Sequence, residues 1–143
     1  MNVFSAMEVL SSGLEAQRTR LNVVSSNLAN ANTTRTDEGG PYQRQDAVFA
    51  SEPVQGRFSE LINDRLAKNV QGVKTVDIVK DPSPPRLVYD PEHVDANADG
   101  YVAYPDISMV EEMVNMMMAS RAYEAGTTAM QTMTSAARSA LKI

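Results

Sequence analysis

Residues 3–28, VFSAMEVLSSGLEAQRTRLNVVSSNL, carry the pattern that decides how this 143-residue chain folds. Apolar side chains recur along it in steps that alternate four and three residues, and only one member of the stripe is polar: Val3, Met7, Leu10, Leu14, Gln17, Leu21, Val24 and Leu28. Such a repeat is typical of a helix that packs along another helix. The run at 27–34 is rich in Asn, whose side-chain amide competes for backbone hydrogen bonds and which tolerates a left-handed backbone. We therefore expect a helix that begins near Asn2 or Ser5 and ends within that run.

A second stripe of the same kind crosses residues 107–143. Its members are again separated by alternating steps of four and three residues: Met109, Met113, Met116, Ser120, Tyr123, Thr127, Met130, Thr134, Ala137 and Leu141. Pro105 cannot lie in a helix interior, and Ser108 with Glu111 has the spacing of a capping box, so this helix should begin near 106–108. Gly126 costs a helix interior about 1 kcal/mol relative to alanine, and we expect either a bend there or the close approach of another backbone.

Charge is concentrated between the two stripes. Residues 1–34 hold four charged side chains and residues 107–143 hold six, whereas residues 35–106 hold twenty-one. Helices that face water are normally rich in Glu, Lys and Arg, so both ends are expected to be covered on most sides. At 1.5 Å per residue the two helices would be roughly 40 Å and 50 Å long, which makes a middle region of about seventy residues too short to wrap either one. The cover is expected to come from other molecules.

The middle of the chain is predicted to be a small β-containing module. Short strands are expected at 42–49, 73–79, 86–89 and 101–104, because these runs lie between turns rich in Gly, Pro and Asp. Apolar residues at helical spacing also predict a short amphipathic helix near 57–70. The chain is thus divided into three parts, an N-terminal helical segment, the β-containing module and a C-terminal helical segment, at 1–34, 35–105 and 106–143.

Composition excludes several classes of function. The net charge is −5 and the isoelectric point is about 4.8, without the clustered Lys and Arg that bind phosphates, so no nucleic-acid partner is expected. The sequence has neither a signal-peptide pattern nor a long apolar run, so we expect no cleaved leader and no membrane insertion. There is no cysteine, and the single histidine, His93, has no second His with which to share a metal. Phosphate-binding and nucleophile motifs are also missing, so we expect no enzyme activity, no cofactor and no small-molecule substrate.

One motif suggests calcium. Residues 95–100, DANADG, match the opening of an EF-hand loop, which places oxygen ligands at positions one, three and five and glycine at six. Position twelve is Asp106 instead of the longer Glu, and Pro91 and Pro105 oppose the two flanking helices. The preferred interpretation is a turn built by Asp, Asn and Gly. A calcium-responsive binding module and a cytosolic helical adaptor stay open as alternatives to the function below.

The two ends together resemble a known family. The run SNLANANT at 26–33 follows the first stripe, and MVN at 113–115 precedes SRAYEA at 120–125; these look like the terminal signatures of bacterial flagellar axial proteins. More narrowly, GPY at 40–42 and GYV at 100–102, each with the residues that follow it, are similar to the flagellar basal-body rod protein FlgC family.

This resemblance implies a structural subunit of the proximal rod, the torque-transmitting drive shaft that crosses the periplasm. It implies export by the flagellar type III apparatus and assembly with other copies and other rod proteins. We expect the terminal helices to pair as an antiparallel coiled coil within a subunit and to pack against those of neighbours. The predicted assembly interface consists of Met7, Leu10, Leu14, Leu21, Val24, Asn27, Leu28, Asn30, Met109, Met113, Met116, Arg121, Tyr123, Met130 and Leu141.

Overall fold

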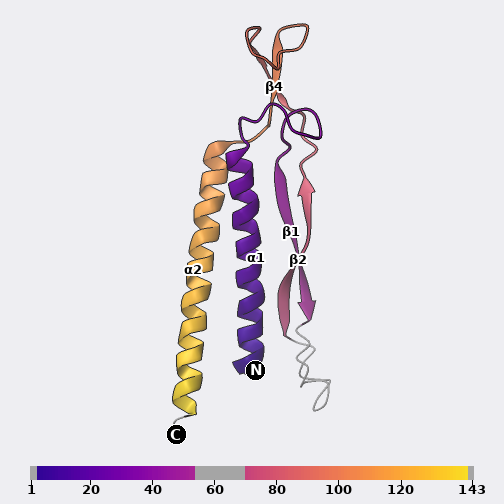
Figure 1. Ribbon diagram of the computed structural model, residues 1–143. Coiled ribbons are helices and arrows are strands. Elements are labelled where there is room, and N and C mark those ends of the chain that lie inside the picture. Colours follow the sequence, from indigo (N-terminus) through magenta and orange to yellow (C-terminus); the bar gives the residue numbers. More distant parts are fainter. Residues whose placement is uncertain (1–2, 54–69, 142–143) are drawn as a thin grey trace.

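The computed structural model describes residues 3–53 and 70–141, whose elements follow in the order α1, β1, β2, β3, β4 and α2 (Figure 1). The fold class predicted from the sequence is confirmed, because two long helices flank a small antiparallel β region along the chain. The short helix expected near 57–70 falls almost wholly on residues 54–69 and lies outside the described residues.

The two helices lie side by side and antiparallel. Helix α1 spans Val3–Ala29 and α2 spans Met109–Ala140, with the start of α1 and the end of α2 at the same end of the pair (Figure 1). Helix α1 begins and ends close to the predicted positions, and α2 begins one residue after the range predicted for its start. Local sequence signals were therefore sufficient to place these three helix ends.

Side chains of the predicted residues cap the end of α1 and the start of α2. The Asn30 amide donates to the Ser26 carbonyl at 2.9 Å, and Asn30 Oδ1 accepts from the Thr33 hydroxyl at 3.2 Å, so the polar run satisfies groups that the last turn of α1 leaves free. At the start of α2, the Ser108 hydroxyl accepts from the Glu111 N–H at 3.4 Å. Ser108 is the N-cap residue.

The strands within residues 3–53 and 70–141 form two separate two-stranded sheets. Strand β1 (Gln45–Pro53) pairs antiparallel with β2 (Gln71–Lys80), and a bulge interrupts their register between Val48 and Phe49. Strand β3 (Arg86–Tyr89) pairs with β4 (Tyr101–Tyr104) in a shorter hairpin that lies beyond the ends of the helices (Figure 1). The bounds predicted for β3 and β4 match residue for residue, whereas β1 begins three residues later than expected.

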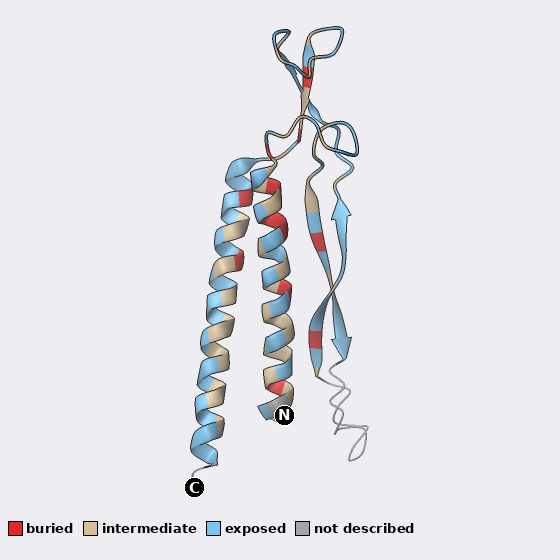
Figure 2. Ribbon diagram, in the orientation of Figure 1, coloured by how far each residue is buried: buried red, intermediate tan, exposed pale blue. Residues whose placement is uncertain are grey.

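Helix α1 lies between α2 on one side and the β1–β2 ribbon on the other (Figure 1). The Ser12 hydroxyl accepts from the Val73 N–H at 3.1 Å, and the Arg20 guanidinium lies 5.1 Å from the centroid of the Phe49 ring. The buried side chains of α1 fall within one arc of about 100° around the helix, because 3.6 residues make one turn (Figure 2): Ala6, Ala16, Val23, Val24 and Asn27.

The expectation that other molecules must cover α1 is wrong on the side where the ribbon lies. A strand rises about 3.3 Å per residue, more than twice the rise of a helix, so nine or ten residues of strand run along about 30 Å of the helix. The number of residues in the middle region does not reveal this difference in rise. A middle region too short to wrap a helix is long enough to line one side of it.

Helix α2 is covered much less. Only Glu112 and Ala119 are buried among its residues, and both lie on the side of α1 (Figure 2). A Cβ added to Gly126 would meet Leu14 Cδ2 at 2.8 Å, so the close approach expected at this glycine is made by a side chain and not by a backbone. The helix continues through Gly126 as one element.

Candidate functional site

The outward side of α2 presents a continuous apolar surface near the start of the helix. Its members, here called the methionine face, are between 44% and 72% exposed: Met109, Val110, Met113, Val114, Met117 and Met118. Contiguous apolar patches of this kind mark interaction surfaces, because isolated soluble domains rarely leave them open to water. Met109 and Met113 were predicted as interface residues from the heptad stripe. The other four were missed because they lie beside that stripe.

The remaining predicted interface residues fall into three groups. Arg121 is exposed on α2, and Leu141 is exposed at the C-cap of that helix. Val24 and Asn27 are buried within the chain, which leaves them no surface to offer a neighbour. Partly buried positions make up the third group: Met7, Leu10, Leu14, Leu21, Leu28, Asn30, Met116, Tyr123 and Met130.

Asn27 is the centre of a hydrogen-bonded cluster inside the chain. Its amide donates to the Gln45 carbonyl at 2.8 Å and to Glu112 Oε2 at 3.1 Å. Its Oδ1 accepts from the Gln45 N–H at 2.9 Å and from the Tyr42 hydroxyl at 3.1 Å. Neither helix termination alone nor a bond to a neighbouring subunit describes this residue, because its side chain joins α1 to the start of β1 and to α2.

Glu112 is the charged member of the same cluster. It is 1% exposed, and its Oε1 accepts from Arg44 Nε at 2.9 Å. A buried carboxylate requires such a partner, since an unpaired charge away from water is strongly disfavoured. We call Asn27, Arg44 and Glu112 the polar junction, because they connect α1, the residue preceding β1 and α2.

The environment of Arg44 keeps it charged. Burial acts to lower the pKa of its guanidinium, but the hydrogen bond and charge of Glu112, together with Asp46 and Asp81, outweigh burial and raise that pKa. The pKa of Asp81 is lowered in turn, chiefly because its carboxylate accepts from the Ser83 hydroxyl at 2.7 Å and the Ser83 N–H at 3.0 Å. Arg44 therefore brings a positive charge to the junction, with its Nε 2.9 Å from Glu112 Oε1.

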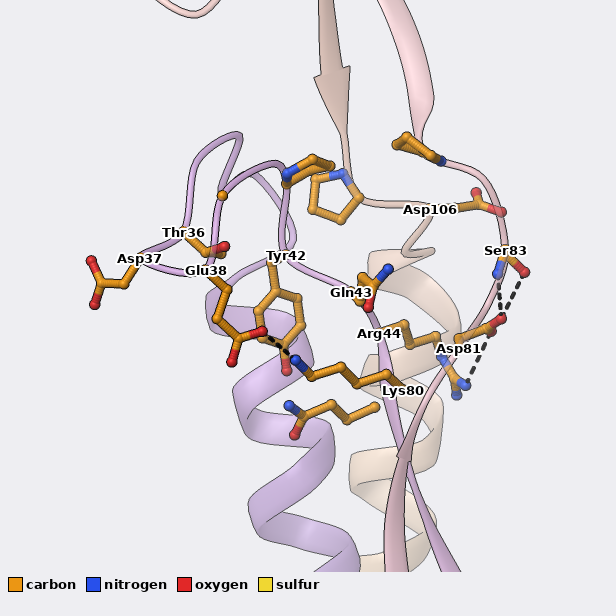
Figure 3. Close-up of a pocket in the computed structure, with 15 residues that line it drawn as sticks. Thr36, Asp37, Glu38, Tyr42, Gln43, Arg44, Lys80, Asp81, Ser83 and Asp106 are labelled. Carbon is orange, nitrogen blue, oxygen red and sulfur yellow. Dashed lines mark hydrogen bonds and ion pairs between the residues drawn. The ribbon is translucent and has the colours of Figure 1, made fainter.

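A polar hollow opens beside the junction (Figure 3). It lies between residues 36–45, the end of β2, the turn at 81–85 and residues 105–106. Its two cations are already paired, Lys80 with Glu38 and Arg44 with Asp81 and Glu112. The lining therefore lacks the free cations that a phosphate-bearing ligand would need.

The segment that resembled a calcium loop is a turn, as predicted. Asn97 Oδ1 accepts from the Asp99 N–H at 3.0 Å and from the Tyr101 N–H at 2.9 Å, while Gly100 has a φ of 81°. Asp95 Oδ2 accepts from the Thr34 hydroxyl at 2.8 Å, which ties the turn to the segment after α1. Within residues 3–53 and 70–141 there is no group of three or more His, Cys, Asp or Glu arranged to hold a metal ion.

Comparisons with known proteins decide the family. Residues 7–35 match the family model described as flagella basal body rod protein, and residues 98–143 match the one described as flagellar basal body rod FlgEFG protein C-terminal. A flagellar basal-body rod protein FlgC of Borreliella burgdorferi is 47% identical over 152 residues, which cover 100% of this chain and 98% of the relative. The chain belongs to the FlgC family. FlgC proteins of Bacillus subtilis and Salmonella typhimurium are 42% and 36% identical, covering 91% and 94% of this chain and 90% and 92% of the relatives.

Membership of the FlgC family makes the chain a structural subunit of the flagellar basal-body rod and not an enzyme. It also implies assembly with other rod proteins, and it favours neither the cytosolic adaptor nor the calcium module. In the described part of the chain, neither helix has the length and apolar character needed to cross a bilayer. The two family matches contain Asn27, Glu112 and the methionine face, whereas Arg44 and the β1–β2 ribbon lie between them.

Proposed function

We propose that this FlgC-family subunit polymerises through its terminal helices, with the methionine face of α2 covered by neighbouring copies and by other rod proteins. The observation that carries the proposal is the difference in cover between the two helices. Helix α1 has neighbours on two sides within its own chain, whereas six large apolar side chains of α2 are left 44–72% exposed. Burial of that face on assembly supplies a hydrophobic driving force for rod growth.

Methionine suits a surface whose neighbours differ from place to place. The thioether side chain is unbranched and polarizable, so one residue can fill gaps of different shape. Four of the six members of the methionine face are Met. A rod subunit that contacts both its own copies and other rod proteins would need this adaptability, and the packed helices would carry torque along the shaft.

The proposal extends to the route of the subunit. It is exported by the flagellar type III apparatus and takes its place in the part of the rod that crosses the periplasm. The chain has no cysteine, so passage into that oxidising compartment creates no disulfide. This is consistent with the proposed route and is not specific to it.

The test is a charge placed on the methionine face. Met117→Glu puts a carboxylate where the proposal expects apolar contact, and Gln131→Glu adds the same charge at an exposed position farther along α2. Cells that produce each variant are assayed for swimming, for completed rods in isolated basal bodies and for subunit in the export fraction. We expect the Met117 variant to be exported but left out of rods, and the Gln131 variant to assemble.

Normal rods from Met117→Glu would exclude the methionine face as an assembly surface. Retention of both variants inside the cell would instead point to a defect in export. The two parts of the proposal are therefore separated by where the subunit is found.

A further inference from the structure

The large apolar side chains on the inner side of α2, such as Met116 and Tyr123, are partly and not fully buried. Ala16 and Ala119 are buried, and Gly126 faces Leu14. Among the described residues, the largest fully buried side chains are Glu112, Val102 and Asn27, so two of these three are polar and both lie where α1 meets α2. The polar members of this contact, Asn27 and Glu112, are thus more deeply buried than its large apolar side chains.

Small residues at heptad spacing tolerate a shift along the helix. Ala119 and Gly126 are seven residues apart on the side of α2 that faces α1, and neither side chain extends beyond Cβ. A slip of seven residues that brings Met133 opposite Leu14 would place Gly126 where Ala119 now lies. Methionine is unbranched and flexible, so Met133 can adapt to its new neighbour more easily than a branched side chain could. The same slip would carry Glu112 about 10 Å from its partners, because a helix rises 1.5 Å per residue.

We propose that the polar junction is a register lock, which sets the alignment of α2 along α1 and, through Arg44 and Gln45, the alignment of the β1–β2 ribbon. Glu112 can be buried only where Arg44 Nε reaches it, here at 2.9 Å, and where the Asn27 amide donates to it at 3.1 Å. The same Asn27 side chain holds both backbone groups of Gln45, the first residue of β1. Buried polar groups that select one register among several are a known use of such clusters.

The lock predicts a result different from that of a merely stabilising contact. Replacing both members of a buried ion pair with apolar residues often leaves stability unchanged or improves it. In Arg44→Met/Glu112→Met the charges disappear together, while Asn27 retains its bonds to Gln45 and Tyr42. This variant should keep the helix pair but lose the preference for one alignment.

Register is measured with pairs of engineered cysteines, since the natural chain has none. Leu14→Cys/Gly126→Cys reports the observed alignment, in which these positions touch, and Leu14→Cys/Met133→Cys reports an alignment shifted by seven residues. Each pair is combined with the intact junction and with Arg44→Met/Glu112→Met in the full chain. Cross-links within one chain are quantified by mass spectrometry, both in purified subunit and in isolated basal bodies.

With the intact junction we expect the 14–126 cross-link to dominate. In the double Met variant the 14–133 cross-link should rise by about tenfold relative to it. The matched control is Lys74→Met/Glu52→Met, which removes an exposed ion pair of 3.1 Å from the same ribbon and should leave the ratio unchanged.

Two results would overturn the lock. The first is a double Met variant that still cross-links only at 14–126. The second is a double Met variant that forms neither cross-link while the Lys74→Met/Glu52→Met control forms the 14–126 cross-link. The second result would make the junction a requirement for folding and not for alignment. Since the cross-links lie within one chain, their outcome is independent of whether the methionine face mediates assembly.

Discussion

Replacing Asn27 with Ala should destabilise the subunit far more than the same change at Asn30, three residues along the chain. Asn27 is completely buried and makes four hydrogen bonds that join three parts of the chain. Asn30 is only partly buried, and its side chain bonds to Ser26 and Thr33 at the end of its own helix. Because both substitutions exchange Asn for Ala near one helix end, their difference isolates the polar junction.

The magnitude follows from the groups that each substitution leaves unpaired. A neutral hydrogen bond contributes about 1 kcal/mol and one to a charged group about 2 kcal/mol, so three neutral bonds and the bond to Glu112 total about 5 kcal/mol. Water that enters the vacated space would recover part of this, which leaves an expected loss of about 3–5 kcal/mol for Asn27→Ala. Asn30→Ala should cost about 1 kcal/mol, because water replaces its bonds at the helix end. A loss of the first size is a large fraction of the stability of an ordinary domain.

Urea unfolding of the purified full chain, followed by circular dichroism, measures both variants. The midpoint should fall strongly for Asn27→Ala and slightly for Asn30→Ala, without a change in slope for either. In cells, swimming should be lost with the first variant and kept with the second. Equal midpoints for the two variants, or a cost below about 1 kcal/mol at Asn27, would refute the assignment of the junction as the main polar link between the helices.

Three further changes test other parts of the structure. Gly126→Leu should cost about 1–3 kcal/mol in urea unfolding, because its side chain would collide with Leu14, and adding Leu14→Ala should restore most of the loss; absence of rescue would contradict this contact. Leu21→Asp places a charge in a partly buried position of α1 and should abolish rod completion while export persists, whereas Asn22→Asp at an exposed position should swim normally. Calorimetry with calcium at about millimolar concentration should give no binding heat, and a saturable signal would revive the loop at 95–100 as a site.

Residues that cap helices, break helices or form turns explain why so much of the fold was predictable. Pro105 and Ser108 mark the start of α2 through backbone chemistry that acts within a few residues, and the Asn and Thr run ends α1 in the same way. Tyr101, the first residue of β4, directly follows the turn at Gly100, and a glycine turn of this kind often precedes a short strand. Signals of this range need no knowledge of the tertiary fold.

The polar junction could not be predicted in the same way, because its members are far apart in the sequence. Glu112 directly follows the Glu of the predicted capping box, in the first turn, where an exposed acidic residue would also be favoured by the helix dipole. Its partner Arg44 is 68 residues away and lies in a segment that the pattern assigned to a strand. Only the packing of α1 against both α2 and the ribbon brings these two side chains together.

The heptad stripe predicted for α2 combines residues from two different sides of the helix, because hydrophobicity alone does not distinguish those sides. Met116, Tyr123 and Met130 are partly buried, whereas Met109 and Met113 are about half exposed, so the predicted line crosses from the inner side of the helix to the outer side. The contact with α1 instead includes Glu112, Ala119 and Gly126, which a search for large apolar residues passes over. A helix that must pair within its chain and also pack against neighbours carries apolar residues on both sides, and a single sequence gives no reason to prefer one. The close approach of the helices decides part of it, because small residues such as Ala119 and Gly126 lie where α1 comes near, whereas methionines occur on both sides of α2.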